Sequence, residues 1–271
     1  AVGFTGSLAG GKALFDLCAS REEPIPFFGE LGSINPMFIL PKAISNKGEE
    51  IANGWASSLT MGAGQFCTNP GIAIVVEGEE TKNFINHVSS FLSIVGPQIM
   101  LTDGIAQAYR NGCERMASFN VTSKLNSKNE INRTALPQLF VTTGKVWLKN
   151  IELSEEVFGP SGLIVKVKDI SEMMEIAKKL TGQLTCTLHM EDDDHDAAYK
   201  LLPILERKAG RILANGFPTG VEVCESMVHG GPFPASTNFG ATSVGTLSIR
   251  RFLRPVCYQN IPTSLLSSDA K

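Results

Sequence analysis

Short apolar segments alternate with amphipathic helical segments along most of the chain, and this alternation constrains the fold more than any other feature. Residues 72–76 and 163–167 are apolar runs of strand length, whereas residues 81–95 carry apolar side chains at helical spacing. Strands separated by helices of about 10–15 residues form crossover units, which favour a mainly parallel sheet. We expect further strands at residues 37–40, 139–143, 184–190 and 211–214, and further helices at residues 11–20, 49–60, 103–117, 171–180 and 194–208. The sequence therefore predicts an α/β fold, with a mainly parallel sheet flanked by helices.

The carboxyl-terminal segment loses this alternation, because glycines and prolines such as Gly230, Pro232 and Pro255 interrupt it. We expect a loop-rich segment that packs against another part of the protein. Two polar residues, Thr81 and Ser171, stand where helical patterns begin, and we expect them to be helix N-caps.

Length and composition are those of a globular protein. The chain has 271 residues, of which 43% are hydrophobic and 19% charged, so it is long enough for a sizeable core and is not a disordered chain. The net charge of −3 argues against a general nucleic-acid-binding protein, and no apolar run is long enough to span a membrane. The six cysteines include no Cys-x-x-Cys pair and no two histidines have metal-ligand spacing, so we expect no metal site. With no signal peptide visible, reduced thiols in a cytoplasmic protein are expected.

Cys67 is the first candidate for chemistry, because it lies in a loop of small residues, 61–71, directly ahead of an apolar strand. Glycines in such a loop let backbone N–H groups converge on a small space, which stabilisation of an oxyanion requires. A thiol there is a nucleophile if a neighbouring group lowers its pKa. A small buried side chain without a chemical role is the alternative, and both interpretations stay open.

Glu30 and His229 are candidates for proton transfer. Glu30 is flanked by Phe27, Phe28 and Leu31, and their apolar surroundings could raise its pKa toward that of a general base. An ordinary surface glutamate at a strand end gives the same pattern. His229 is the one histidine of four that lies in a glycine-rich loop, where an imidazole can reach a site. A hydrogen-bonded structural histidine is the alternative for His229.

Two segments suit the phosphate and ribose groups of a nucleotide. The Gly6-Ser7 turn leads into a helix, whose unpaired N–H groups and dipole favour an anion. An ordinary turn can have the same sequence, and the Gly-x-Gly-x-x-Gly fingerprint of dinucleotide-binding folds is not matched. In the segment Glu155-Glu156-Val157-Phe158-Gly159-Pro160, a carboxylate could meet ribose hydroxyls and a ring could meet a planar group. A solvated acidic turn is the alternative there.

Taken together and in this order, these motifs resemble those of the aldehyde dehydrogenase superfamily. The similar segments are residues 4–7 with Gly11 for the phosphate turn, 29–32 for the general-base motif, 64–68 for the nucleophile motif and 155–160 for the ribose-binding motif. Each motif is weak alone, but four in the order of the family, with Glu30 and Cys67 separated by 37 positions, form a specific pattern. Residues 15–36, 215–222, 227–232 and 254–256 are similar to the branch of bacterial NADP-dependent fatty aldehyde dehydrogenases and 2,5-dioxovalerate (α-ketoglutaric semialdehyde) dehydrogenases.

The resemblance implies the oxidation of an aldehyde to a carboxylate with NADP or NAD as the cofactor. It implies that the Cys67 thiolate attacks the aldehyde, that Glu30 activates the water that hydrolyses the resulting thioester, and that His229 tunes the thiol. The implied cofactor-binding residues are Thr5, Gly6, Ser7, Gly11, Leu31, Glu156 and Phe158.

The resemblance also implies a domain organisation, because members of the family are roughly twice as long as this chain. Residues 1–32 are expected to end a Rossmann-like cofactor-binding domain, and residues 33–228 to form the catalytic domain. Residues 229–271 are expected to pack on the cofactor domain or on a neighbouring subunit. The implied partners are a small aldehyde substrate, a missing amino-terminal half and further copies in a homo-oligomer, with no nucleic acid.

Two other functions stay open on the sequence alone. Cys67 and His229 could serve a cysteine-dependent hydrolase or acyltransferase without a redox step, or the chain could be a truncated domain that acts only in packing and assembly. The phosphate and ribose motifs favour the dehydrogenase over the hydrolase, because a hydrolase has no use for ribose contacts.

Overall fold

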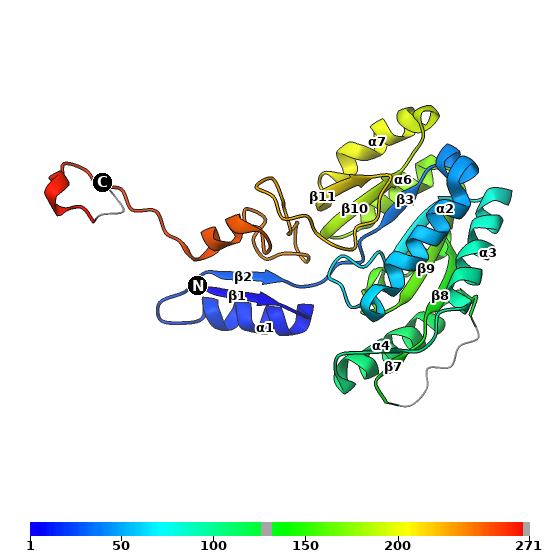
Figure 1. Cartoon of the computed structure of the whole chain (residues 1–271), viewed down its shortest axis with the longest axis horizontal. Helices are drawn as coiled ribbons and strands as arrows, with labels where there is room; N and C mark the ends of the chain where they lie inside the picture. The colour runs from blue at the N-terminus through cyan, green and yellow to red at the C-terminus, as the bar shows by residue number, and fades with distance from the viewer. Residues whose placement is uncertain (126–131, 268–271) are drawn as a thin grey trace.

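A seven-stranded sheet with helices around it forms the larger body, on the right in Figure 1, in a computed structural model that describes residues 1–125 and 132–267. The strand order is β11-β10-β3-β4-β9-β8-β6, and every pairing is parallel except that of β6 with β8. The strands are β3 (Met37–Ile39), β4 (Ile72–Val76), β6 (Thr122–Ser123), β8 (Gln138–Thr143), β9 (Ser161–Val167), β10 (Gln183–His189) and β11 (Ala209–Ala214). The predicted α/β fold with a mainly parallel sheet is confirmed.

Helices cover both faces of this sheet, which is why its strands are apolar on both sides. On β4, Ile72 and Ile74 point into one buried cluster, whereas Ala73 and Val75 point into the other, as the two-residue period of a strand requires. The face of Ala73 and Val75 is covered by α2 (Pro41–Thr60) and α3 (Glu79–Ser93). The opposite face is covered by α4 (Asp103–Ala117), α5 (Gly144–Lys149), α6 (Ile170–Lys179) and α7 (His195–Leu205).

A smaller unit precedes the large sheet. It consists of β1 (Val2–Thr5), α1 (Leu8–Ala19) and β2 (Phe27–Glu30), with β1 and β2 paired in parallel. A second two-stranded sheet pairs β5 (Gln98–Ile99) with β7 (Thr134–Ala135). Short 3₁₀ helices are η1 (Met61–Gly64), η2 (Ile151–Ser154), η3 (Asp192–Asp194), η4 (Thr246–Phe252) and η5 (Thr263–Leu265).

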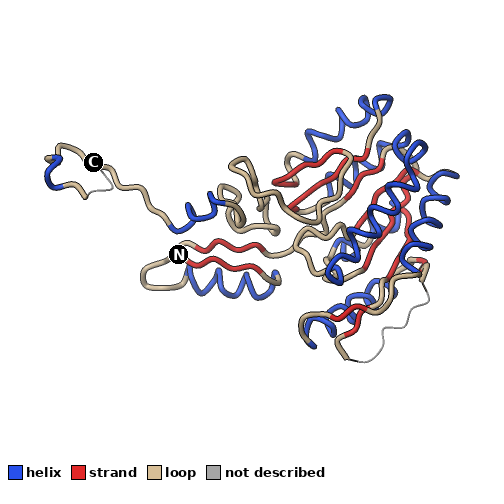
Figure 2. Tube along the Cα trace, viewed as in Figure 1, coloured by secondary structure: helices blue, strands red, loops and turns tan. Residues whose placement is uncertain are grey.

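The carboxyl-terminal segment is loop apart from short helical turns, as the sequence predicted (Figure 2). It returns to the small unit, where Thr237 N–H donates to Gly29 O and the rings of Phe252 and Phe28 lie 6.4 Å apart. The predicted domain boundaries at 32/33 and 228/229 stay predictions, and residues 268–271 of the predicted carboxyl-terminal segment lie outside the described residues.

Four helix starts differ from the sequence prediction, and one of them is α1, which begins at Leu8 rather than residue 11. Thr81 and Ser171 are not N-caps, because α3 is preceded by Gly78 and α6 by Asp169, whose side chain accepts a hydrogen bond from Glu172 N–H. Helix α2 begins at Pro41 rather than residue 49, and a break at Lys47 (φ −131°, ψ 20°) hides its first part from a periodicity argument. Proline suits the first position of a helix, since its missing N–H has no partner to lose there.

In the two described stretches, no helix combines the length and the apolar character needed to cross a membrane.

Candidate active site

Three of the predicted residues meet in one hydrogen-bonded chain. Cys67 Sγ lies 3.2 Å from His229 Nε2, and His229 Nδ1 lies 2.8 Å from Glu30 Oε2. Glu30 ends β2, Cys67 lies in the loop before β4, and His229 comes from the carboxyl-terminal segment. His229 and Glu30 are 3% and 5% exposed, whereas Cys67 is half-buried and thus open to a substrate. The fold therefore assembles a thiol, an imidazole and a carboxylate from segments far apart in the sequence.

Two partners hold a proton on His229. Burial lowers the pKa of His229, but the hydrogen bonds and charges of Cys67 and Glu30 outweigh burial and raise it to about 9. At neutral pH His229 is then an imidazolium between the sulfur and the carboxylate. Its ring is held between the two partners, with Nε2 against Cys67 Sγ and Nδ1 against Glu30 Oε2.

The loop that carries Cys67 is fixed by two asparagines. Asn35 Nδ2 donates to Cys67 O (3.0 Å) and to Asn69 O (2.9 Å), and Asn69 Nδ2 donates to Gly64 O (2.9 Å). Gly64 has a φ of +66°, and a Cβ there would lie 2.3 Å from the carbonyl carbon of Gly159. This left-handed, tightly packed position requires glycine. The small residues of the loop and the two asparagines thus fix the position of Cys67.

A buried polar network holds Asn35 in turn. Gln183 Oε1 accepts hydrogen bonds from Ile34 N–H (2.9 Å) and Asn35 N–H (3.1 Å), and Ser33 Oγ lies 2.9 Å from it. Thr185 Oγ1 donates to Asn35 Oδ1 (3.1 Å). Sequence reasoning missed Gln183 and Thr185, although polar residues in a fully buried strand were a signal for them.

Glu30 is held by its backbone and by a serine that sequence reasoning also missed. Gly6 N–H donates to Glu30 O (3.0 Å), and β1 pairs Thr5 with Glu30. Ser243 Oγ donates to Glu30 Oε2 and lies 3.2 Å from His229 Nδ1. No motif marked Ser243, because it lies in an irregular loop.

The predicted phosphate turn lies directly beside Glu30, since residues 5–7 follow the end of β1. These three residues are exposed, and Ser7 Oγ caps α1 by accepting from Gly10 N–H (3.3 Å). Gly11 is buried instead, and a Cβ there would lie 1.9 Å from Leu31 Cδ2. The structure therefore gives Gly11 a packing role between α1 and Leu31, while the exposed turn can meet a ligand.

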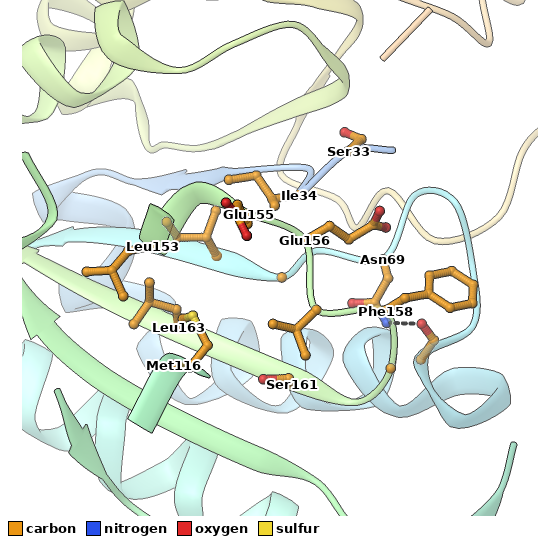
Figure 3. Close-up of a pocket in the computed structure, with 15 residues that line it drawn as sticks. Ser33, Ile34, Asn69, Met116, Leu153, Glu155, Glu156, Phe158, Ser161 and Leu163 are labelled. Atoms are coloured by element: carbon orange, nitrogen blue, oxygen red, sulfur yellow. Dashed lines mark hydrogen bonds between the residues drawn. The ribbon is translucent and has the colours of Figure 1, made fainter. Parts of the chain in front are cut away.

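Glu156 and Phe158 line a pocket beside the Cys67 loop, together with Ser33, Asn69 and Gly64 (Figure 3). Burial raises the pKa of Glu156 to about 7, while a hydrogen bond from Ser33 N–H acts in the opposite direction. A carboxylate has several acceptor positions, so Glu156 can also accept hydrogen bonds from the hydroxyls of a ribose. Of the two acids in this motif, Glu155 is exposed and Glu156 is half-buried, and the ribose-binding role of Glu156 stays a prediction.

Cys67, His229 and Glu30 also offer sulfur, nitrogen and oxygen atoms within 4.8 Å of one another. These are donor types that zinc accepts. Sequence spacing could not show this cluster, because its members lie 37 and 162 positions apart along the chain. The expectation of no metal site stays a prediction.

Comparison with known proteins gives related sequences, although no family model matches the chain. It is 47% identical over 268 residues to the alpha-ketoglutaric semialdehyde dehydrogenase 2 of Azospirillum brasilense, covering 98% of this chain and 51% of that protein. It is 44% identical over 274 residues to the alpha-ketoglutaric semialdehyde dehydrogenase of Acinetobacter baylyi, covering 100% of this chain and 52% of that protein. The chain spans about half the length of the curated relatives it matches.

The fold is also similar to that of solved structures. A Sinorhizobium meliloti protein, assigned as a methylmalonate-semialdehyde dehydrogenase and crystallised with NAD, superposes with a TM-score of 0.77 at 19% identity. The match covers 93% of this chain and 52% of that one. At this identity the likeness shows a shared fold.

Proposed function

We propose a function for this chain on the premise that it belongs to the aldehyde dehydrogenase superfamily, as its sequence relatives and its fold indicate. The proposal is that it supplies the nucleophile and the bases of an enzyme that oxidises an aldehyde to a carboxylate. The observation that carries it is the hydrogen-bonded chain of Cys67, His229 and Glu30 beside the Glu156 pocket.

In the first stage, the Cys67 thiolate attacks the carbonyl carbon of the aldehyde. A carbon–sulfur bond forms, and the carbonyl oxygen becomes an oxyanion. The His229 imidazolium keeps its Nδ1–H on Glu30 and its Nε2–H toward the sulfur, so the ring orientation is fixed. We infer that the backbone N–H of Cys67 donates to the oxyanion, because the neighbouring glycines let the main chain approach it.

A nicotinamide cofactor would supply the acceptor for the hydride that leaves the carbon attached to Cys67. The residues present fit such a group. Glu156 is a half-buried carboxylate that lines a pocket and can accept hydrogen bonds from ribose hydroxyls, Phe158 lines the same pocket, and the exposed turn at residues 5–7 suits a phosphate. The choice of NADP over NAD rests on the sequence resemblance alone, and Leu31 is proposed to contact the nicotinamide.

In the second stage, Glu30 takes a proton from a water molecule that attacks the thioester on Cys67. The oxygen of the water adds to the carbonyl carbon, the carbon–sulfur bond breaks, and the product leaves as a carboxylate, while its proton and the proton on Glu30 pass to solvent. The thiolate returns to its place beside His229. A thiolate is both a good nucleophile and a good leaving group, whereas hydrolysis needs a separate base, and Glu30 provides it.

For the substrate, we propose a semialdehyde that carries a carboxylate, because the two relatives described above are named for α-ketoglutaric semialdehyde. The further proposed partners are an amino-terminal half and additional copies of the chain in a homo-oligomer. A cytoplasmic location is part of the same proposal and is supported by the six free cysteines, because disulfides are rare in cytosolic proteins.

Acylation with p-nitrophenyl acetate tests the proposed division of labour in the 271-residue chain itself. The wild type should release a burst of about one nitrophenolate per chain and then turn over slowly. Cys67→Ser should remove the burst, and Glu30→Gln should keep the burst but stop turnover. Absence of a Cys67-dependent burst contradicts the proposal.

A second candidate function, a cysteine-dependent acyl hydrolase, is favoured by the completeness of the Cys67–His229–Glu30 chain without any other group. Its reaction would need no nicotinamide cofactor. Formation of reduced cofactor from the semialdehyde by the whole protein that contains this chain decides for the dehydrogenase. Ester hydrolysis without any reduction of NADP or NAD decides for the hydrolase.

A further inference from the structure

Ser243 contacts both Glu30 and His229 from the carboxyl-terminal segment. Its Oγ donates to Glu30 Oε2 and lies 3.2 Å from His229 Nδ1 and 3.1 Å from His229 O. Its backbone N–H donates to the same carbonyl of His229 (2.8 Å). The neighbouring Thr242 Oγ1 accepts from His229 N–H (2.9 Å), so this segment holds the main chain of His229 on both sides.

The proposed function gives Glu30 two tasks that conflict in space. During the attack Glu30 accepts Nδ1–H of His229, and during hydrolysis it must turn to a water molecule at the thioester. His229 is 3% exposed, so solvent cannot replace the carboxylate when Glu30 turns away. A buried N–H without a partner is costly, and this cost would oppose the second stage.

We propose that Ser243 is the alternative partner that lets Glu30 leave His229 for the hydrolysis of the thioester. This inference rests on the proposed function. When Glu30 turns away, Ser243 Oγ accepts Nδ1–H from its position 3.2 Å away, and its own hydroxyl proton turns to His229 O at 3.1 Å. Both partners are thus already in place.

The exchange moves no proton between residues and breaks no covalent bond. The single hydroxyl proton of Ser243 rotates from Glu30 Oε2 to the carbonyl of His229. His229 keeps its proton on Nδ1, so its Nε2 still faces the sulfur of Cys67. Glu30 Oε2 loses two donors at once and is free to accept a proton from water. Ser243 is therefore a positioning residue, which acts through Glu30 and His229.

Among the described residues, three other groups near Glu30 and His229 are engaged elsewhere. Cys67 occupies Nε2, on the opposite side of the ring. Glu156 carries a carboxyl that interacts with Glu30 by charge and is held by Ser33 N–H. Arg251 donates to the backbone carbonyl of Ser243 (3.4 Å) and so fixes the loop rather than the ring.

The test separates acylation from deacylation in the 271-residue chain, with p-nitrophenyl acetate as the acyl donor. Ser243→Ala should slow deacylation by about tenfold, the factor that one unpaired buried donor can bring, while the acylation burst stays within about threefold of wild type. Ser243→Thr, which keeps the hydroxyl, should restore deacylation. Ser226→Ala, which removes an exposed serine from the preceding loop, is the matched control and should behave as wild type.

The outcomes also separate this inference from the function on which it rests. If deacylation requires Glu30 but Ser243→Ala deacylates at the wild-type rate, the role of Ser243 alone is overturned. An equal loss of both rates in Ser243→Ala, not restored by threonine, shows a structural role and overturns it as well. A wild type without a Cys67-dependent burst overturns the proposed function together with this inference. Should Ser243→Ala unfold, as circular dichroism would show, Ser243→Gly in the same assay decides by the same criterion.

Discussion

Replacement of His229 by glutamine should change how the stability of the chain depends on pH. The pKa of His229 is raised from 6.5 to about 9 by Cys67 and Glu30, so the folded state binds its proton more tightly than the unfolded state does. Stability from this group is fully present below about pH 6.5 and is lost as the pH rises through 9. One pKa unit corresponds to about 1.4 kcal/mol, so the raised pKa contributes up to about 3 kcal/mol. Solvent screens it little, because His229 is 3% exposed.

Urea unfolding at several values between about pH 6 and pH 10 measures this contribution, as the free energy of unfolding of wild type minus that of His229→Gln. The difference should fall by up to about 3 kcal/mol across the range. His195→Gln is the control, because His195 is an exposed histidine on α7 and its loss should leave the wild-type pH dependence nearly intact. If the free energy of unfolding changes with pH in the same way in wild type and in His229→Gln, the hydrogen-bonded chain is not the cause of the raised pKa.

Cys67, Gly64 and Glu156 each carry a further expectation. Iodoacetamide labelling with peptide mass mapping should modify Cys67 ahead of the exposed Cys224 and Cys257, because an imidazole lies against its sulfur; faster modification of either exposed thiol contradicts this. Gly64→Ala should lower the free energy of unfolding by about 3 kcal/mol or more, since its Cβ would lie 2.3 Å from the carbonyl carbon of Gly159. A Cβ at Gly96 would meet only open space, so Gly96→Ala should change the free energy of unfolding by less than about 0.5 kcal/mol. Similar losses in the two variants would show that packing is not the cause. Because the pKa of Glu156 is raised from 4.5 to about 7, its contribution to stability is present below pH 4.5 and lost as the pH rises through 7. At about pH 8 the urea midpoint of unfolding should therefore be higher for Glu156→Gln than for wild type. A lower midpoint for the variant at that pH would contradict the raised pKa of Glu156.

The parts of the fold that follow from local periodicity could be predicted from the sequence. The helix Asp103–Ala117 and the strand Ile72–Val76 have the predicted bounds, because each has a clear apolar pattern that ends in polar or turn residues. The start of α2 could not be found in this way, since the break at Lys47 interrupts its period. The N-caps of α3 and α6 were predicted two residues or more too late for a different reason. Polar residues also occur inside the first turn of a helix, so the first polar residue of a helical pattern need not be its N-cap.

The candidate site was partly predictable for a different reason. Cys67 and Glu30 lie in motifs with local character, and the order of those motifs indicated that they belong together. The contacts of Ser243 and Gln183 are set by tertiary packing over separations of 213 and 149 residues, so nothing local marks them. Topology explains the convergence of several groups. Cys67, Asn35, Gln183 and Glu156 all precede or begin parallel strands, whose amino ends meet at one edge of the sheet.

The central claim is that Cys67 carries the acyl group that Glu30 releases. The most direct measurement is mass mapping of this chain in its Glu30→Gln form, combined with the proposed amino-terminal half, after incubation with α-ketoglutaric semialdehyde and NADP or NAD. The account predicts an added acyl group on the Cys67 peptide that appears only with the oxidised cofactor and that wild type does not accumulate. An adduct on another residue, or oxidation of the aldehyde by a Cys67→Ser variant, would contradict it.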